Sequence, residues 1–190
     1  MMRVELITHT PEPEKVVATA AKLCYSSSDI ASLREGLTEE KTKSFIERLV
    51  SIGHESPMEH VSFTFGIEGI SRACSHQLVR HRIASYSQKS QRYVSESGFE
   101  FITPPSIEAV PEAKAEFDKQ MDQLLECYNK IADILTNTHE KAFLEQGMSE
   151  KDALNKAKKK AYEDARFVLP NACETKIVVT MNVRTLFNFF

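Results

Sequence analysis

The chain has 190 residues, with 24 lysine and arginine residues against 27 aspartate and glutamate residues, and 42% of its residues are hydrophobic. These values are typical of a globular protein with a real core, and the length predicts one domain over residues 1–190. No apolar run approaches the roughly 20 residues of a membrane span. The N-terminal MMRVELITHT also lacks the features of a signal peptide. We therefore expect a cytoplasmic protein with no membrane partner.

The first third of the chain alternates between short strand and helix patterns. Thr10 and Pro11 form an N-cap and first-turn pair, and Thr38 is a second N-cap whose helix ends at Gly53. The predicted elements, in order, are a strand over 3–9, a helix over 11–24, a polar loop over 26–29, a helix over 39–52 and a strand over 61–67.

The remaining two thirds are richer in helix. A helix over 71–80 would place Arg72, His76 and Arg80 on one face, with Ala73, Cys74 and Leu78 facing a core. The further predicted elements are a strand over 99–103, a long amphipathic helix over 111–146 with Ile134 on its inward face, a helix begun by Ser149, a buried strand over 176–182 and a helix begun by Asn182. This order predicts an α+β fold with a mixed or antiparallel sheet flanked by long helices, and not a Rossmann fold.

One segment carries an unusual charge distribution. Residues 70–95 contain five lysine and arginine residues and no aspartate or glutamate, although the rest of the chain has 19 positive against 27 negative residues. A solvated basic surface, or arginines paired with acids elsewhere in the fold, is one interpretation. Nucleic-acid binding is a second, but Tyr86 and Tyr93 are the only aromatic residues in the segment and the whole chain is acidic.

A small phosphorylated ligand is the third interpretation of the basic segment. Arginine binds phosphate through its planar fork, and serine and glutamine residues between the charges supply further donors. The six glycines form neither GxGxxG nor a P-loop, so side chains would have to hold the phosphate. The four cysteines, about fifty residues apart, form no disulfide or metal pattern, and we expect reduced, mostly buried thiols.

Four motifs of the chain resemble those of the flavin-dependent thymidylate synthases, the ThyX family. RHRIASYSQKSQRY begins at Arg80 and contains RHR followed by seven residues and Ser90, which is the signature of that family. The other three are GHESPMEHVSFTF from Gly53, ARFVLP from Ala165 and MNVRTLFNF from Met181. The four motifs occur in the family's order from residue 53 to the end of the chain.

The resemblance implies an enzyme that methylates deoxyuridine monophosphate (dUMP) to thymidylate (dTMP) in thymidylate biosynthesis. The carbon comes from 5,10-methylenetetrahydrofolate, and the hydride comes from FAD reduced by NADPH. The family forms homotetramers with shared active sites, so small molecules and further copies of the chain are the implied partners, and nucleic acid is not. Three anionic ligands would then meet the acid-free segment.

The resemblance also implies roles for individual residues. His54 would help place the methyl donor near the flavin, and Ser90 would position the substrate, since a serine without a dedicated base is a weak nucleophile. The implied FAD contacts are Ser56, Arg80, His81, Arg82, Gln88, Asn182, Arg184 and Asn188. The implied dUMP contacts are Gln77, Arg80, Gln88, Ser90, Arg92 and Arg166. No metal site is expected, because the histidines at 54 and 60 do not have HExxH spacing.

Two departures from the family pattern matter. Gln88 stands where some members carry glutamate, which changes the local charge. The family also places an arginine just beyond its last motif, whereas this sequence ends at Phe190, so we expect the C-terminal end of the family domain to be missing here. A catalytically impaired flavin- or nucleotide-binding relative is therefore the alternative function.

Overall fold

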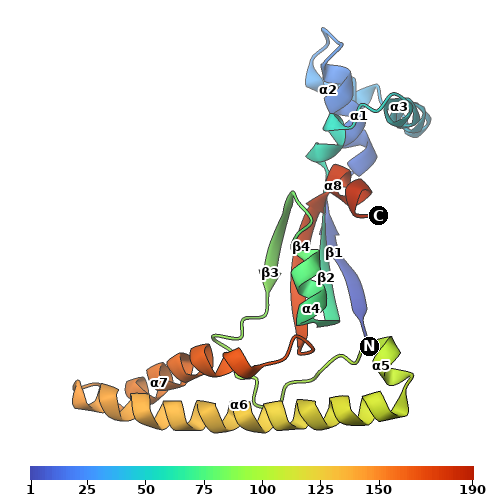
Figure 1. Cartoon of the computed structure of the whole chain (residues 1–190). Helices are drawn as coiled ribbons and strands as arrows, with labels where there is room; N and C mark the ends of the chain where they lie inside the picture. Colours follow the sequence, from blue (N-terminus) through green and yellow to red (C-terminus); the bar gives the residue numbers. More distant parts are fainter. The chain divides into compact units, whose positions relative to one another are not determined.

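The computed structural model describes residues 1–190, in which helices and strands follow one another irregularly (Figure 1). In chain order the elements are β1 (Arg3–His9), α1 (Pro13–Leu23), α2 (Ile30–Glu35), α3 (Glu39–Ser51), η1 (Ser56–His60), β2 (Ser62–Ser71), α4 (Arg72–Leu78), β3 (Ala84–Gln88), α5 (Pro105–Glu108), α6 (Pro111–Glu145), α7 (Glu150–Ala165), η2 (Arg166–Val168), β4 (Glu174–Asn182) and α8 (Val183–Phe189). This composition confirms the predicted α+β class.

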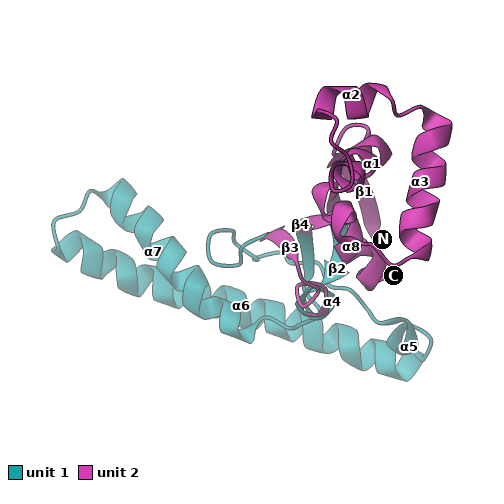
Figure 2. Ribbon diagram, turned by 90° about the horizontal axis from the view of Figure 1, so that it is seen from above, with its two compact units in different colours: residues 1, 68–76, 88–176 teal, residues 2–67, 77–87, 177–190 magenta.

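The chain folds as two compact units, and each unit is assembled from separate stretches of sequence (Figure 2). Unit 1 contains residues 1, 68–76 and 88–176, and unit 2 contains residues 2–67, 77–87 and 177–190. The basic segment 70–95 contributes to both units. Its positive charges therefore lie in two different environments.

Unit 2 holds most of a four-stranded antiparallel sheet with the strand order β1-β2-β4-β3. Thr64 on β2 and Thr180 on β4 lie opposite each other, with their hydroxyl oxygens 2.9 Å apart. The sequence predicts a buried strand here, but β4 is buried on one face only. Ile177, Val179 and Met181 are buried, whereas the intervening side chains are more exposed, which is the alternation of a strand with one covered face.

The helices of unit 2 begin and end for local reasons. Thr38 caps α3 as predicted, and Gly53 follows this helix with a φ of 68°, a left-handed conformation that glycine adopts without strain. The predicted start of α1 is wrong, because the helix begins at Pro13. Thr10 instead extends the β1–β2 pairing: its N–H donates to the Ser62 carbonyl, and its hydroxyl accepts from the Ser62 N–H, both at 3.0 Å.

A compact apolar core holds the helices of unit 2 against the start of β2. Its buried members come from α1, α3, η1 and the residue before β2, and they are Val17, Ala21, Leu49, Met58 and Val61. Burying a Val, Leu or Met side chain stabilises a fold by about 1.5–3 kcal/mol, so the contacts that Met58 makes in this core hold η1 in place. His54, which precedes η1, and Ser56, its first residue, belong to the candidate site.

Unit 1 is dominated by α6 and α7, which lie side by side as an antiparallel pair (Figures 1 and 2). Ser149 caps α7 as predicted, since its hydroxyl accepts from the Asp152 N–H at 3.2 Å. One face of α7 consists of fully buried alanines at four-residue intervals: Ala153, Ala157, Ala161 and Ala165. Small side chains let two helices approach closely, and this stripe therefore determines how α7 presents the residues that follow it.

Three predictions fail in unit 1. Residues 99–103 form no strand; Phe101 makes only an isolated bridge with Cys173. Helix α4 buries Ser75 and exposes both Ala73 and Cys74; the burial of Ser75 is tolerated because its hydroxyl donates to the Arg72 carbonyl at 2.9 Å and accepts from the Gln88 side chain at 2.7 Å. On α6, Ile134 is 56% exposed and does not face inward. None of the helices combines the length and hydropathy that a membrane-spanning segment requires.

Candidate functional site

The RHR motif lies in a turn of unit 2 and not on a helix. Helix α4 ends at Leu78, and the N–H groups of Arg80 and His81 bond to the carbonyls three residues before them. The predicted helix to Arg80 is therefore wrong by two residues. The Tyr86 hydroxyl closes the turn, since it lies 2.9 Å from the Leu78 carbonyl and 2.7 Å from the His81 carbonyl. Burial raises the pKa of this phenol, which therefore stays a donor.

The two arginines of the motif are available to an anion. Arg80 and Arg82 are exposed, and no carboxylate of unit 2 lies within 4.0 Å of either guanidinium group. The Arg82 guanidinium lies over the Tyr86 ring, 5.9 Å from its centroid. Arg184 differs, because it forms ion pairs with Glu55 and Glu59 that raise its pKa. Of these three arginines, Arg80 and Arg82 therefore keep their positive charge unpaired.

Helix α8 joins the RHR turn through two contacts. The Thr185 hydroxyl donates to the Ile83 carbonyl at 2.9 Å, and the His81 ring meets the Phe189 ring edge to face at 4.8 Å. Asn182 is the N-cap of α8, because its side-chain oxygen accepts from the Thr185 N–H at 2.8 Å. Arg184 and Asn188 are both exposed on α8, at the four-residue spacing that the sequence predicted. Unit 2 thus holds the RHR end of the signature motif, residues 80–87, together with the motifs that begin at Gly53 and Met181.

His54 and Ser56 flank the start of η1 in the same unit. His54 is half-buried, and its ring meets the Tyr25 ring edge to face at 6.4 Å. It lines a cavity of about 340 Å³ together with apolar residues of α3. Ser56 is exposed, as is Gln77 near the end of α4. All of the implied FAD contacts except Gln88 therefore belong to unit 2.

Arg92 and Arg166, two of the residues implied for dUMP, belong to unit 1. Arg92 lies 3.7 Å from a Glu163 carboxylate oxygen, and the Arg166 Nε donates to the Glu163 backbone carbonyl at 3.1 Å. Both arginines therefore meet at the last turn of α7. Ser90 uses its hydroxyl to accept from the Arg92 N–H at 3.2 Å. Ser90 and His54, the two residues expected closest to the reaction, lie in different units.

Gln88 is held by the interior of unit 1. Its side-chain N–H group donates to the hydroxyls of Ser75, at 2.7 Å, and Thr175, at 3.2 Å. Both hydroxyl residues are nearly inaccessible, at 0% and 2% exposure. Sequence reasoning did not find them, because Thr175 is 87 residues from Gln88 and neither residue belongs to a motif.

The cysteines behave as reduced thiols, but the expectation that most are buried is wrong. Cys24, Cys74 and Cys127 are exposed, and only Cys173 is buried. Burial raises the pKa of Cys173 to about 12, so this thiol stays protonated near neutral pH. A protonated thiol is a poor nucleophile, and the structure offers no cysteine nucleophile at this position.

Comparison with known proteins places these features in a family. Residues 5–190 match the family model described as thymidylate synthase complementing protein. A flavin-dependent thymidylate synthase of Clostridium tetani is 53% identical over all of this chain and 73% of its own length. Enzymes of the same name from Geobacter sulfurreducens and Pyrococcus abyssi are 47% and 39% identical over the whole chain, which covers 72% and 70% of their lengths.

The geometry defines a protein with unpaired arginines on one unit and a second, separate arginine group on the other, as expected of a protein that binds anionic ligands. The chain belongs to the family of flavin-dependent thymidylate synthases, the thymidylate synthase complementing proteins.

Proposed function

We propose that the protein is a flavin-dependent thymidylate synthase that converts dUMP to dTMP, with 5,10-methylenetetrahydrofolate as the carbon donor and NADPH as the reductant. The observation that carries the proposal is the unpaired charge of Arg80 and Arg82 in a turn that belongs to the family's signature motif. Exposed guanidinium groups without a carboxylate partner are free to form charge-assisted hydrogen bonds with an anionic ligand.

FAD is the flavin that we assign to unit 2. Arg80 and Arg82 are suited to its pyrophosphate, because each guanidinium group can donate two parallel hydrogen bonds to phosphate oxygens. The remaining FAD contacts proposed for this unit are Ser56, His81, Asn182, Arg184 and Asn188, and Gln88 is the one proposed contact from unit 1. When bound and reduced, FAD supplies the hydride of the reaction.

The nucleotide is assigned mainly to unit 1. Arg92 and Arg166 would bind its phosphate; both already lie near Glu163, whose carboxylate is weakly placed at 3.7 Å and about half exposed, so phosphate can displace it. Ser90 would orient dUMP through its hydroxyl. Gln77, Arg80 and Gln88 complete the proposed substrate contacts, and His54 would orient the methyl donor.

A cytoplasmic homotetramer is the assembly that we propose. The number of copies and the location follow from the family resemblance; association itself is supported by β1, an edge strand whose Val4, Leu6 and Ile7 are 48–56% exposed. An exposed apolar edge strand invites association, and a partner copy would cover it. Light scattering after gel filtration would give four times the chain mass of 21.5 kDa; a monomeric mass would contradict the tetramer.

The absorption spectrum of the purified protein tests the proposed function. We expect the oxidised-flavin bands, their loss under anaerobic NADPH, and a different rate of loss when dUMP is present. Arg82→Gln should weaken FAD binding by about 10- to 100-fold, the range for a hydrogen bond to a charged group. Arg166→Gln should keep the flavin and abolish the effect of dUMP.

Arg34→Gln is the matched control for Arg82→Gln. Arg34 is also an exposed arginine of unit 2, but it pairs with Glu12 at 3.1 Å and lies outside every motif. This variant should bind FAD as the unaltered protein does. A protein that remains colourless when FAD is added, or an equal loss in Arg34→Gln and Arg82→Gln, would refute the assignment.

A further inference from the structure

The loop between β3 and residue 96 carries two residues that the proposed function assigns to the nucleotide. Ser90 and Arg92 lie in its first half, and residues 92–94 at its outer part are exposed. No helix or strand stabilises this stretch. Residues at both ends of the loop must therefore hold it, since ordering a free loop costs about 1–2 kcal/mol per residue.

The first end of the loop is anchored through its backbone. The N–H of Lys89 donates to the Lys176 carbonyl at 3.0 Å, and its carbonyl accepts from the Arg72 guanidinium at 3.3 Å. Gln88, one residue earlier, is held by the hydroxyls of Ser75 and Thr175. The loop therefore leaves a well-fixed point of unit 1.

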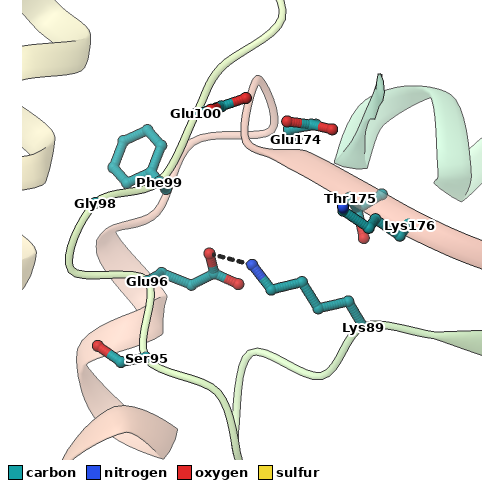
Figure 3. A pocket seen from close by; sticks show the side chains of 9 residues that line it. All are labelled: Lys89, Ser95, Glu96, Gly98, Phe99, Glu100, Glu174, Thr175 and Lys176. Carbon is teal, nitrogen blue, oxygen red and sulfur yellow. Dashed lines mark hydrogen bonds and ion pairs between the residues drawn. The ribbon is translucent and has the colours of Figure 1, made fainter. Parts of the chain in front are cut away.

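The second end of the loop is fixed by Glu96. This residue is 3% exposed, and its carboxylate accepts from the Lys89 ammonium group at 2.9 Å, while its backbone N–H donates to the Tyr128 hydroxyl at 3.1 Å. Figure 3 shows the Glu96 side chain extended toward that of Lys89 across the wall of a cavity of about 290 Å³. Tyr128 is fully buried in the core of α6 and α7.

We propose that Glu96 is a positioning residue for nucleotide binding. Its ion pair with Lys89 joins the two ends of the loop, and its bond to Tyr128 ties the loop to α6, so that Ser90 and Arg92 stand ready for the phosphate. The Glu96 carboxylate is almost completely removed from water. Coulomb attraction is stronger in such a buried environment than at the protein surface, and this strengthens the pair. This inference rests on the assignment of Ser90 and Arg92 to dUMP.

The charge pattern of the sequence gives the same pair a second role. Segment 70–95 contains no acid, and Glu96 is the first carboxylate after it. The structure places that carboxylate on Lys89 and not on Arg92, whose nearest carboxylate is the more distant Glu163 at 3.7 Å. Glu96 thus neutralises a lysine that anchors the loop and leaves the loop's arginine with only a weak, half-exposed partner, Glu163, which a phosphate can replace.

The test compares Glu96→Gln and Lys89→Met in the flavin-loaded protein, with dUMP titrated by calorimetry. Each variant should weaken dUMP binding by about 10-fold or more, since each breaks a charged hydrogen bond, with FAD affinity unchanged. The double variant should lose less than the sum of the single losses, because the two residues act as one unit. Amide exchange of residues 90–95 should be faster in each single variant without any ligand.

Lys114→Met is the matched control. Lys114 is 29% exposed against 33% for Lys89, belongs to the same unit and pairs with Asp118 on α6, away from the loop. It should leave dUMP affinity and loop exchange within about twofold of the unaltered protein. Folded Glu96→Gln and Lys89→Met proteins with unaltered dUMP affinity would overturn the inference.

Failure of the proposed function would look different. An unaltered protein that binds no dUMP, while Glu96→Gln still speeds exchange of residues 90–95, would refute the nucleotide assignment and with it the role of Glu96 in binding. Unaltered exchange in both single variants would refute the joining of the loop ends itself.

Discussion

Replacement of Asn182 by alanine tests how this residue serves the flavin site. The family resemblance implies that Asn182 contacts FAD, but in the structure its side-chain oxygen accepts from the Thr185 N–H at 2.8 Å and so caps α8. Helix α8 has only seven residues and carries Arg184 and Asn188, two further proposed FAD contacts. A helix this short does not form by its own propensity, so its cap and its packing decide whether it is present.

The expected magnitude follows from the lost cap. Removal of an N-cap side chain costs about 0.5–2 kcal/mol, and the Thr185 N–H that loses its partner belongs to a residue only 6% exposed. If FAD binds only the capped helix, the same free energy is lost from binding. Asn182→Ala should therefore raise the dissociation constant of FAD by about 2- to 30-fold.

Fluorescence titration of the apoprotein with FAD measures this constant, and amide exchange at Thr185 reports the helix directly. Asn182→Ser keeps a capping oxygen and should restore most of the affinity. Ser149→Ala removes the corresponding cap of α7 in unit 1 and should destabilise that helix without changing FAD affinity. An equal loss in Asn182→Ser and Asn182→Ala would refute the capping argument, because it would mean that the amide itself contacts FAD.

Three further predictions concern residues away from α8. Ala157→Leu should lower the free energy of unfolding by about 1–3 kcal/mol, because Ala157 is fully buried between α6 and α7. Lys158→Leu, on the exposed face of the same helix, should change the free energy of unfolding by less than about 0.5 kcal/mol. Urea titration of both variants measures the difference. The pKa of Cys173 is about 12 in the folded protein and 9.0 for an ordinary cysteine. As the pH rises, the unfolded chain therefore loses this proton first, and the free energy of unfolding should fall between pH 9.0 and about 12. Cys173→Ala should lack that part of the slope in urea titrations repeated across this range, and an identical slope would contradict the assignment. Tyr86→Phe should weaken FAD binding by about 2- to 10-fold, since the hydroxyl holds the turn at His81; unchanged affinity in a fluorescence titration would refute this.

Local interactions explain what could be predicted from the sequence. The caps at Thr38, Ser149 and Asn182 are confirmed because each depends on a side chain and an N–H three residues away. Helix α6 is confirmed because its apolar period extends over 35 residues. The family was also readable from the sequence, since the RHR motif depends on residue identity and order.

Long-range contacts explain the errors. Strand β3 was missed because its alternating serines carry no strand signal, and it forms by pairing with β4 in the sheet. Residues 99–103 alternate like a strand, but pairing with the segment around Cys173 is limited to a single bridge. Thr10 has the local features of a cap, but its bonds to Ser62 are part of the strand pairing.

The sequence by itself determined the α+β class, the long helices, the family and the concentration of positive charge between residues 70 and 95. Only the tertiary structure decided which of those charges are free. Lys89 is paired with Glu96, Arg92 lies 3.7 Å from Glu163, and Arg80 has no carboxylate partner in its unit; outside this segment, Arg184 is paired with Glu55 and Glu59. The physical reason is that ion pairing depends on distance in space, and the partners of Arg184 are more than a hundred residues away along the chain.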